Sequence, residues 1–273
     1  MSQFVVDLRP PGSHYIFATV RVETAYPDGS TGSGTGFFFQ TETAAGQPSH
    51  FLITNKHVLD GATSARLRFH YGASNEPWHF TVADHRTVEV DAGPPLWFQH
   101  PDPEVDLCAL RLSDLQARLP QLKGIFFTAI SESEILDVES ERRLPSMLTI
   151  AMVGYPQGIW DQQNNLPIQR RGTTASHPGV SFDGRREVMI DMACFPGSSG
   201  SPVVYHDTQY FASAPRFLGV LYAGPTVTAE GQVLRMKVPT QVRRGVEVQT
   251  MMHLGYVIKA EVVRELVNLL GDL

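Results

Sequence analysis

The chain has 273 residues, of which 42% are hydrophobic and 18% charged, so it can bury a sizeable core and extensive disorder is not expected. Its 22 Lys and Arg residues against 28 Asp and Glu residues give a net charge of −6, which argues against a nucleic-acid partner because phosphate binding needs clustered cations. No run of about 18 apolar residues occurs, so we expect no membrane-spanning helix.

The amino terminus and the two cysteines bear on the cellular compartment. Residues 1–7 lack a basic run followed by an apolar stretch, so no secretory signal is expected. Cys108 and Cys194 have apolar neighbours and imply no disulfide framework, and buried thiols are favoured over reactive ones. A reducing, cytoplasmic location is therefore predicted.

Short strand-like segments, separated by Gly, Pro, Asn and Asp turns, recur in two series. The first series comprises Tyr15–Val22, Gly36–Gln40, His50–Thr54, Ala65–Phe69, Val88–Val90 and Leu107–Leu112. The second comprises Leu148–Val153, Val188–Met192, Pro202–Tyr205, Phe217–Tyr222 and Val233–Val238. Residues 113–145 lie between them, are partly helical in pattern, and are expected to connect two β units.

The segment 260–270 carries apolar residues at helical spacing and is followed by Gly271. The pattern predicts a terminal helix that packs on the β units. Binding of another protein through this face is the less favoured interpretation.

Three segments carry the candidate chemistry. An apolar strand from Phe51 ends in a polar turn that presents His57. Asp106 opens a second apolar strand, where an unpaired carboxylate is costly, so a partner is expected. Ser199 lies in a Gly- and Ser-rich turn whose glycines allow successive N–H groups to point into one cavity. Each feature alone is weak, because single histidines, strand-end aspartates and Gly/Ser turns are common.

Together the three residues predict nucleophilic catalysis. A serine hydroxyl is a poor nucleophile unless a base removes its proton, a histidine can be that base, and a buried carboxylate can orient the imidazole. The order His57, Asp106, Ser199 places the first two in the first β unit and the serine in the second.

In this order the motifs resemble the trypsin-like (chymotrypsin-fold) serine peptidases, especially bacterial members without disulfides such as the HtrA and glutamyl-endopeptidase branches. Gly34–Phe38 is similar to their glycine-bearing strand, and Thr54–Val58 to the T-x-x-H-V motif. Asp106–Leu110 resembles D-[LI]-A-[LV], and residues 191–202 resemble the run through P-G-N-S-G-G-P.

The resemblance implies an all-β fold of two six-stranded antiparallel β-barrels with a C-terminal α-helix. The expected division is 1–125 for the barrel with His57 and Asp106, 126–245 for the barrel with Ser199, and 246–273 for a C-terminal strand and helix.

The resemblance also assigns roles within a serine endopeptidase. Ser199 is the expected nucleophile, His57 the general base and then acid, and Asp106 the orienting carboxylate. The oxyanion hole is expected at Gly197, Ser198 and Ser199, with N–H groups from the first and the last.

The substrate pocket departs from trypsin. Ser198 stands where trypsins carry Asp, so activation by a freed N-terminus is not expected, and the oxyanion loop is less firmly held. Ala193, six residues before the nucleophile, brings no carboxylate for a Lys or Arg substrate, and Leu221 replaces the His of glutamyl endopeptidases. A small or apolar P1 residue is therefore favoured. The expected substrate-binding residues are Ala193, Phe195, Leu221, Tyr222, Ala223 and Gly224.

Other classes fit less well. An α/β-hydrolase elbow needs Gly where Ser201 lies, and its triad order is reversed. No H-E-x-x-H or paired Cys/His spacing occurs, so neither a metal nor another cofactor is expected. Prolines on both sides of Asp102, close to His100, favour a rigid turn there. The alternative function is a catalytically silent trypsin-like binding or partner module. The expected partners are a protein or peptide substrate and an unidentified regulatory protein, without nucleic acid or membrane.

Overall fold

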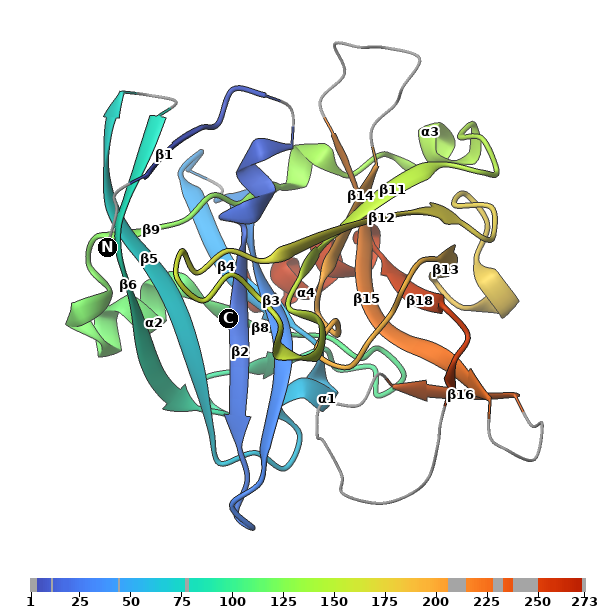
Figure 1. The fold of residues 1–273 in the computed structure, drawn as a ribbon. Helices are drawn as coiled ribbons and strands as arrows, with labels where there is room; N and C mark the ends of the chain where they lie inside the picture. Colours follow the sequence, from blue (N-terminus) through green and yellow to red (C-terminus); the bar gives the residue numbers. More distant parts are fainter. Residues whose placement is uncertain are drawn as a thin grey trace.

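The computed structural model describes residues 4–10, 12–43, 45–76, 79–205, 215–227, 233–237 and 250–271. The chain is mostly β and forms two sheets, one from each half of the sequence (Figure 1). The N-terminal sheet, blue to cyan, lies beside the C-terminal sheet, yellow to red, and a C-terminal helix lies behind the strands.

The N-terminal sheet follows the order β1-β6-β5-β2-β3-β4-β8-β7. Two short strands join it from the connecting region: β9 pairs with β5, and β10 pairs in parallel with β3. Its strands are β1 (Phe4–Asp7), β2 (Thr19–Ala25), β3 (Thr31–Glu42), β4 (Pro48–Thr54), β5 (Ser64–Glu76), β6 (His79–Asp91), β7 (Phe98–Gln99), β8 (Cys108–Arg111), β9 (Ile125–Phe126) and β10 (Ile130–Ser131).

The C-terminal sheet closes on itself. Its path runs β14-β11-β12-β13-β18-β15, and β15 pairs back to β14, which makes an antiparallel barrel of six strands. β16 and β17 extend the far end of β15. The strands are β11 (Thr149–Gly154), β12 (Ile168–Thr174), β13 (Glu187–Asp191), β14 (Pro202–Tyr205), β15 (Arg216–Val227), β16 (Val233–Lys237), β17 (Thr250–Met251) and β18 (Leu254–Lys259). The predicted chymotrypsin-like fold class is confirmed.

Short helices occupy the connections, and the predicted terminal helix is confirmed. The α-helices are α1 (Lys56–Leu59), α2 (Leu112–Arg118), α3 (Val138–Arg142) and α4 (Ala260–Gly271). The 3-10 helices are η1 (Ser13–Ile16), η2 (Pro120–Leu122), η3 (Glu132–Glu134), η4 (Pro156–Gly158) and η5 (Phe182–Gly184).

Helix α4 helps to join the two sheets through a shared core. Its Val263 and Leu266 belong to one buried cluster with Phe37 of β3 and Val220 of β15. Because this cluster draws apolar side chains from both sheets, the hydrophobic effect holds the sheets against each other.

The local predictions differ from the structure in several places, and two of these differences have a clear cause in the sequence. Tyr15–Val22 was predicted as a strand, but its first residues lie in η1 and the strand begins at Thr19, after the turn at Gly12, where φ is 82°. Strand β12 was not predicted, because two consecutive arginines, Arg170 and Arg171, break its apolar alternation. The predicted strand end at Val238 lies outside the described residues, and the proposed division into units remains a prediction.

Candidate active site

His57 and Asp106 are brought together within the N-terminal sheet. His57 lies in α1, directly after β4, and Asp106 lies just before β8. The two strands are neighbours, with Thr54 opposite Cys108. His57 Nδ1 lies 2.5 Å from Asp106 Oδ2, and the His57 backbone N–H donates to Oδ1 at 3.1 Å. The carboxylate therefore holds both the ring and the backbone of the histidine.

Ser199 approaches the other side of the imidazole from the C-terminal barrel. Its Oγ lies 2.9 Å from His57 Nε2. The Asp106 and Ser199 residues are buried, and the His57 side chain is 10% exposed. The structure thus places aspartate, histidine and serine in one hydrogen-bonded chain with the imidazole in the middle.

The turn that carries Ser199 depends on two glycines in the left-handed region. Gly197 and Gly200 both have φ of 84°, and a Cβ on Gly200 would lie 1.9 Å from the Thr35 carbonyl oxygen. The Ser198 N–H already donates to the Phe195 carbonyl at 3.0 Å. Of the three residues expected to form the oxyanion hole, Ser198 therefore shapes the turn and does not offer its N–H.

Thr35 of β3 connects the turn that carries Ser199 to the N-terminal sheet. This turn is called the nucleophile turn below, after the role predicted for Ser199. Its hydroxyl donates to the Gly197 carbonyl at 3.0 Å and accepts from the Tyr155 N–H at 3.1 Å. Its backbone N–H donates to the Ser199 carbonyl at 2.8 Å. This buried residue lies within the glycine-bearing segment Gly34–Phe38, but nothing in that pattern indicates that its side chain bridges the two sheets.

Asn55 is a second polar residue that sequence reasoning missed. Its side-chain amide donates to the Asp106 carbonyl at 2.7 Å, and the residue is fully buried. Its neighbour Thr54 donates from Oγ1 to the Thr35 carbonyl at 2.8 Å. The two residues immediately before His57 therefore hold the backbone of Asp106 and of Thr35.

The loop after β11 packs against the nucleophile turn. The Gln157 N–H donates to the Pro196 carbonyl, and Gln157 itself has a left-handed φ of 49°. Further along the loop, Trp160 stacks under the Arg21 guanidinium at 4.0 Å. The Trp160 ring is therefore packed against a side chain of β2.

The residues expected to bind substrate divide into two groups. Ala193 and Phe195 are half-buried beside the nucleophile turn. Leu221 is fully buried and uses both backbone groups internally: its N–H donates to the Ser201 carbonyl at 3.0 Å, and its carbonyl accepts from the Gly200 N–H at 2.9 Å. The backbone of Leu221 is thus unavailable to an extended substrate.

The rest of that strand continues into the β15–β16 pair. Tyr222 donates its hydroxyl to Glu187 Oε1 at 2.6 Å, so the ring is anchored in the barrel. Ala223 and Gly224 pair on one side with residues of β16. The role of these three residues in substrate binding remains a prediction.

Neither cysteine has the environment of a nucleophile. Cys108 and Cys194 are free and buried. Burial raises the pKa of Cys194 to about 12 and also raises the pKa of Cys108. The expected packing role of both side chains agrees with these positions.

The histidine and aspartate near the triad have structural contacts. His100 is buried with Nε2 3.3 Å from Glu265 Oε1, and its Nδ1 accepts the Asp102 N–H at 3.2 Å. The Asp102 carbonyl accepts from Lys56 Nζ at 2.9 Å. This pair forms the rigid turn that the flanking prolines predicted.

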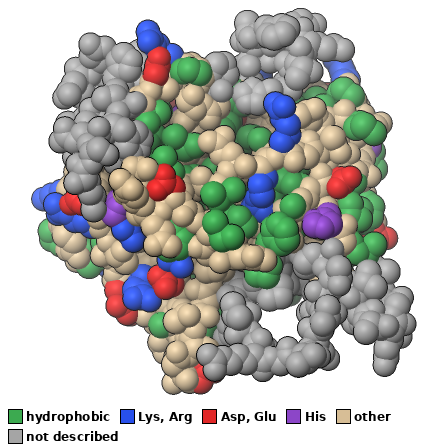
Figure 2. Space-filling view, in the orientation of Figure 1, with side chains coloured by type: hydrophobic (Ala, Val, Ile, Leu, Met, Phe, Trp, Pro, Cys, Tyr) green, Lys and Arg blue, Asp and Glu red, His purple; other side chains and the backbone are tan. Residues whose placement is uncertain are grey.

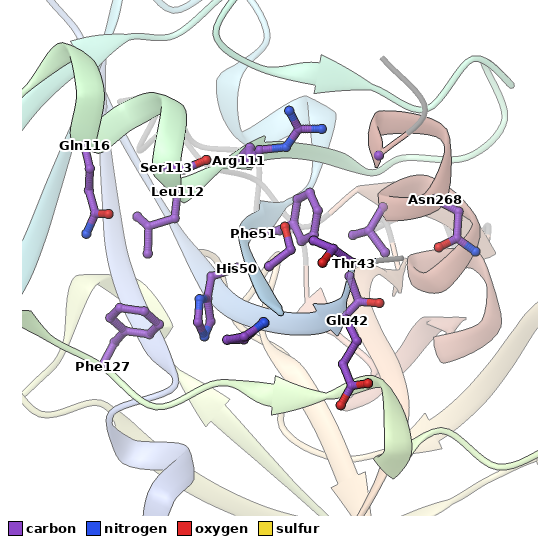
Figure 3. Close-up of a pocket in the computed structure, with 15 residues that line it drawn as sticks. Glu42, Thr43, His50, Phe51, Arg111, Leu112, Ser113, Gln116, Phe127 and Asn268 are labelled. Carbon is purple, nitrogen blue, oxygen red and sulfur yellow. The ribbon is translucent and has the colours of Figure 1, made fainter. Parts of the chain in front are cut away.

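A cavity of about 700 Å³ lies between the β3–β4 hairpin, α2 and α4 (Figure 3). His50 and Phe127 line one side of it, and Glu42 and Asn268 line another. None of the three triad residues lines this cavity, so it is separate from the candidate active site.

Within the described ranges, no group of three His, Cys, Asp or Glu side chains is arranged to hold a metal ion. None of the helices in the part of the chain that the structure describes combines the length and apolar character needed to cross a membrane.

The geometry agrees with the comparison to known families. The model of the trypsin-like peptidase domain matches residues 34–212, which is more than half of the chain. The chain therefore belongs to the trypsin-like peptidase family and has the fold of the serine proteases. The resemblance read from the motifs is confirmed at this level, while the bacterial and HtrA-like details remain predictions.

Similar solved structures are distant in sequence. The HL collagenase is 10% identical with a TM-score of 0.50, and the match covers 94% of each chain. An inactivated protease paralogue of the scabies mite is 13% identical with a TM-score of 0.48, covering 93% of this chain and 96% of that one. The thermostable serine protease AL20 from an extremophilic microorganism is 14% identical with a TM-score of 0.42, covering 92% and 95%. No curated protein matches the sequence.

Proposed function

We propose that this member of the trypsin-like peptidase family is an active serine endopeptidase. The observation that carries the proposal is the continuous contact from Asp106 through His57 to Ser199, with 2.9 Å between His57 Nε2 and Ser199 Oγ. That distance lies within reach of direct proton transfer from the hydroxyl to the imidazole.

In the proposed reaction, Ser199 Oγ attacks the carbonyl carbon of the scissile peptide bond while His57 Nε2 takes its proton. The resulting oxyanion accepts hydrogen bonds from the N–H groups of Gly197 and Ser199. His57 then donates the proton to the leaving amine, which yields an acyl-enzyme. Water, activated by the same imidazole, hydrolyses that ester and restores the hydroxyl.

Asp106 acts on this cycle through His57. A carboxylate at Nδ1 keeps the proton on that nitrogen, so Nε2 is free to accept the serine proton, and it stabilises the imidazolium that forms. The cytoplasmic location and a regulatory partner remain predictions, and the proposed substrate is a protein or peptide.

A serine-reactive fluorophosphonate probe tests the function. The wild type should be labelled, Ser199→Ala should not, and Ser198→Ala is the matched control because it removes a neighbouring buried hydroxyl and should still be labelled. The second assay uses a quenched fluorescent peptide that has several residues on each side of the scissile bond. Cleavage of this peptide establishes endopeptidase activity. A folded wild-type protein that neither reacts with the probe nor cleaves peptides would favour a catalytically silent binding module.

A further inference from the structure

An arginine lies on the interior face of the C-terminal barrel. On β12, Arg170 stands opposite Met152 of β11, and Met152 is fully buried in the barrel core. Directly opposite residues of an antiparallel pair share one face of the sheet, so Arg170 lies on the inward face. Charged side chains are rare in such positions unless they have a partner.

The guanidinium of Arg170 is only partly satisfied. Its Nη1 donates to the Ala193 carbonyl at 2.6 Å. Its Nε and Nη2 are buried and have no hydrogen-bond partner, and no carboxylate forms an ion pair with Arg170 among the described residues. Burial lowers the pKa of Arg170 to about 10, which still leaves the group charged at neutral pH. A buried charge with two unused donors is costly to folding, so its position calls for a partner.

The two unused nitrogens lie on the same edge of the guanidinium plane. That edge, Nε–H with Nη2–H, presents two parallel donors that match the two oxygens of a carboxylate. Ala193 holds the third nitrogen and so fixes the plane. The arrangement is a preorganised half of a bidentate arginine–carboxylate pair.

The position of Arg170 relates this edge to the proposed substrate pocket. Ala193 lies six residues before Ser199 and was expected to line that pocket. Cys194, the next residue, is buried and close enough to influence the ionisation of Arg170. Because Nε and Nη2 of Arg170 are buried, the local dielectric is low, and a low dielectric strengthens a charge pair.

Figure 2 shows how charged and hydrophobic side chains are distributed over one face of the molecule. In Figure 2 hydrophobic side chains gather near the centre of the face, and the visible acidic side chains of the described residues lie toward its periphery.

We propose that Arg170 is the specificity-determining residue of this peptidase, and that its Nε/Nη2 edge binds the carboxylate of an Asp or Glu side chain at P1. The inference rests on the proposed function. It departs from the small or apolar P1 residue that the sequence favoured, because that expectation considered only Ala193 and Leu221, and the inward position of Arg170 was not visible in the sequence.

The test compares quenched peptides that differ only at P1: Asp, Glu, Asn, Gln, Leu and Lys. For the wild type, kcat/KM for Asp or Glu should exceed that for the uncharged Asn or Gln isostere by about 100-fold, as expected for a hydrogen-bonded charge pair. Arg170→Met should abolish this preference. Arg171→Met is the matched control, since it removes an equal charge from the exposed neighbouring position and should keep the preference.

A stability measurement separates a role in specificity from a purely structural role. Since Arg170→Met removes a buried group with two unpaired donors, its unfolding temperature should be no lower than that of the wild type. A fall of several degrees without a change in P1 preference would overturn the proposal and make Arg170 a structural support of the Ala193 carbonyl. Arg170→Gln is the second variant if the Met variant does not fold, and it too should lose the preference.

Fluorophosphonate labelling distinguishes failure of the P1 specificity assignment from failure of the proposed peptidase function. If the wild type is labelled and cleaves peptides without favouring Asp or Glu at P1, the specificity assignment is wrong and the proposed function stands. If the folded wild type is not labelled, the proposed function fails and the assignment fails with it.

Discussion

The two contacts of His57 are built in different ways. Its contact with Asp106 lies within one sheet, because β4 and β8 are paired and each residue lies at the end of its strand. Its contact with Ser199 crosses from one sheet to the other, so the 2.9 Å distance depends on how the two units pack. The first contact is a consequence of strand register, whereas the second is a consequence of tertiary packing.

The cross-sheet contact therefore needs its own supports. Thr35 is hydrogen-bonded to both Gly197 and Ser199. The buried apolar cluster that includes α4 also holds the two sheets together. If this comparison is right, changes within the N-terminal sheet should disturb the tautomer of the histidine, whereas changes at the interface should disturb the position of the serine.

The largest effect is expected from Asp106→Asn. An amide at this position donates to Nδ1, so the ring proton moves to Nε2, which can no longer accept from Ser199 Oγ. We expect kcat to fall by about 10⁴-fold with little change in KM or in the circular dichroism spectrum. A variant that keeps near-normal turnover would show that the contact within the sheet does not orient the histidine.

Thr35→Val should have the next largest effect on turnover. It keeps the side-chain shape but leaves the Gly197 carbonyl and the Tyr155 N–H without their partner, so the nucleophile turn loosens. We expect kcat to fall about 10- to 100-fold while KM changes less, because small misplacements of a nucleophile are costly. Thr41→Val, on the same strand but bonded to Glu132, is the control and should retain activity. Equal activity of the two variants would contradict the role of the Thr35 hydroxyl in holding the nucleophile turn against the N-terminal sheet, here called the Thr35 clamp.

A second cross-sheet contact is expected to show in stability. His70 of β5 lies 3.4 Å from the Asn165 amide of the β11–β12 loop, and burial, followed by the charge of nearby His85, lowers its pKa from 6.5 to about 4. As the pH falls, the unfolded chain therefore binds a proton at His70 at a higher pH than the folded chain does. The contribution of His70 is complete above about pH 6.5 and is lost as the pH falls toward 4, by about 3 kcal/mol in total.

Urea unfolding at pH 7.5 and pH 4.5 measures this loss, and His70→Gln should show a smaller difference between the two values. If the variant retains the full wild-type difference, other groups account for the acid sensitivity.

The last comparison concerns reactivity and takes one thiol from each sheet. Cys108 and Cys194 are buried, and the raised pKa of both disfavours the reactive thiolate. Both should react with a disulfide reagent at pH 8 at least about 100-fold more slowly in the folded protein than in guanidinium chloride. Rapid reaction of Cys194 alone would indicate that the barrel end beside Arg170 opens readily.

Prediction from sequence worked best where chemistry and local pattern coincided. The strand ending at Thr54, the strand after Asp106 and the helix at 260–270 all follow from apolar periodicity. Prediction failed at η1, where a glycine turn delays the strand, and at β12, where arginines conceal the alternation.

The sequence by itself determined the fold class and singled out His57, Asp106 and Ser199, because an ordered set of motifs limits both the strands and the residues that can act at their ends. The tertiary structure decided the rest: the meeting of Ser199 with His57, the clamp by Thr35 and the inward position of Arg170. These depend on contacts between segments far apart in the chain, and neither periodicity nor spacing records which side chains will face each other once the two sheets have packed.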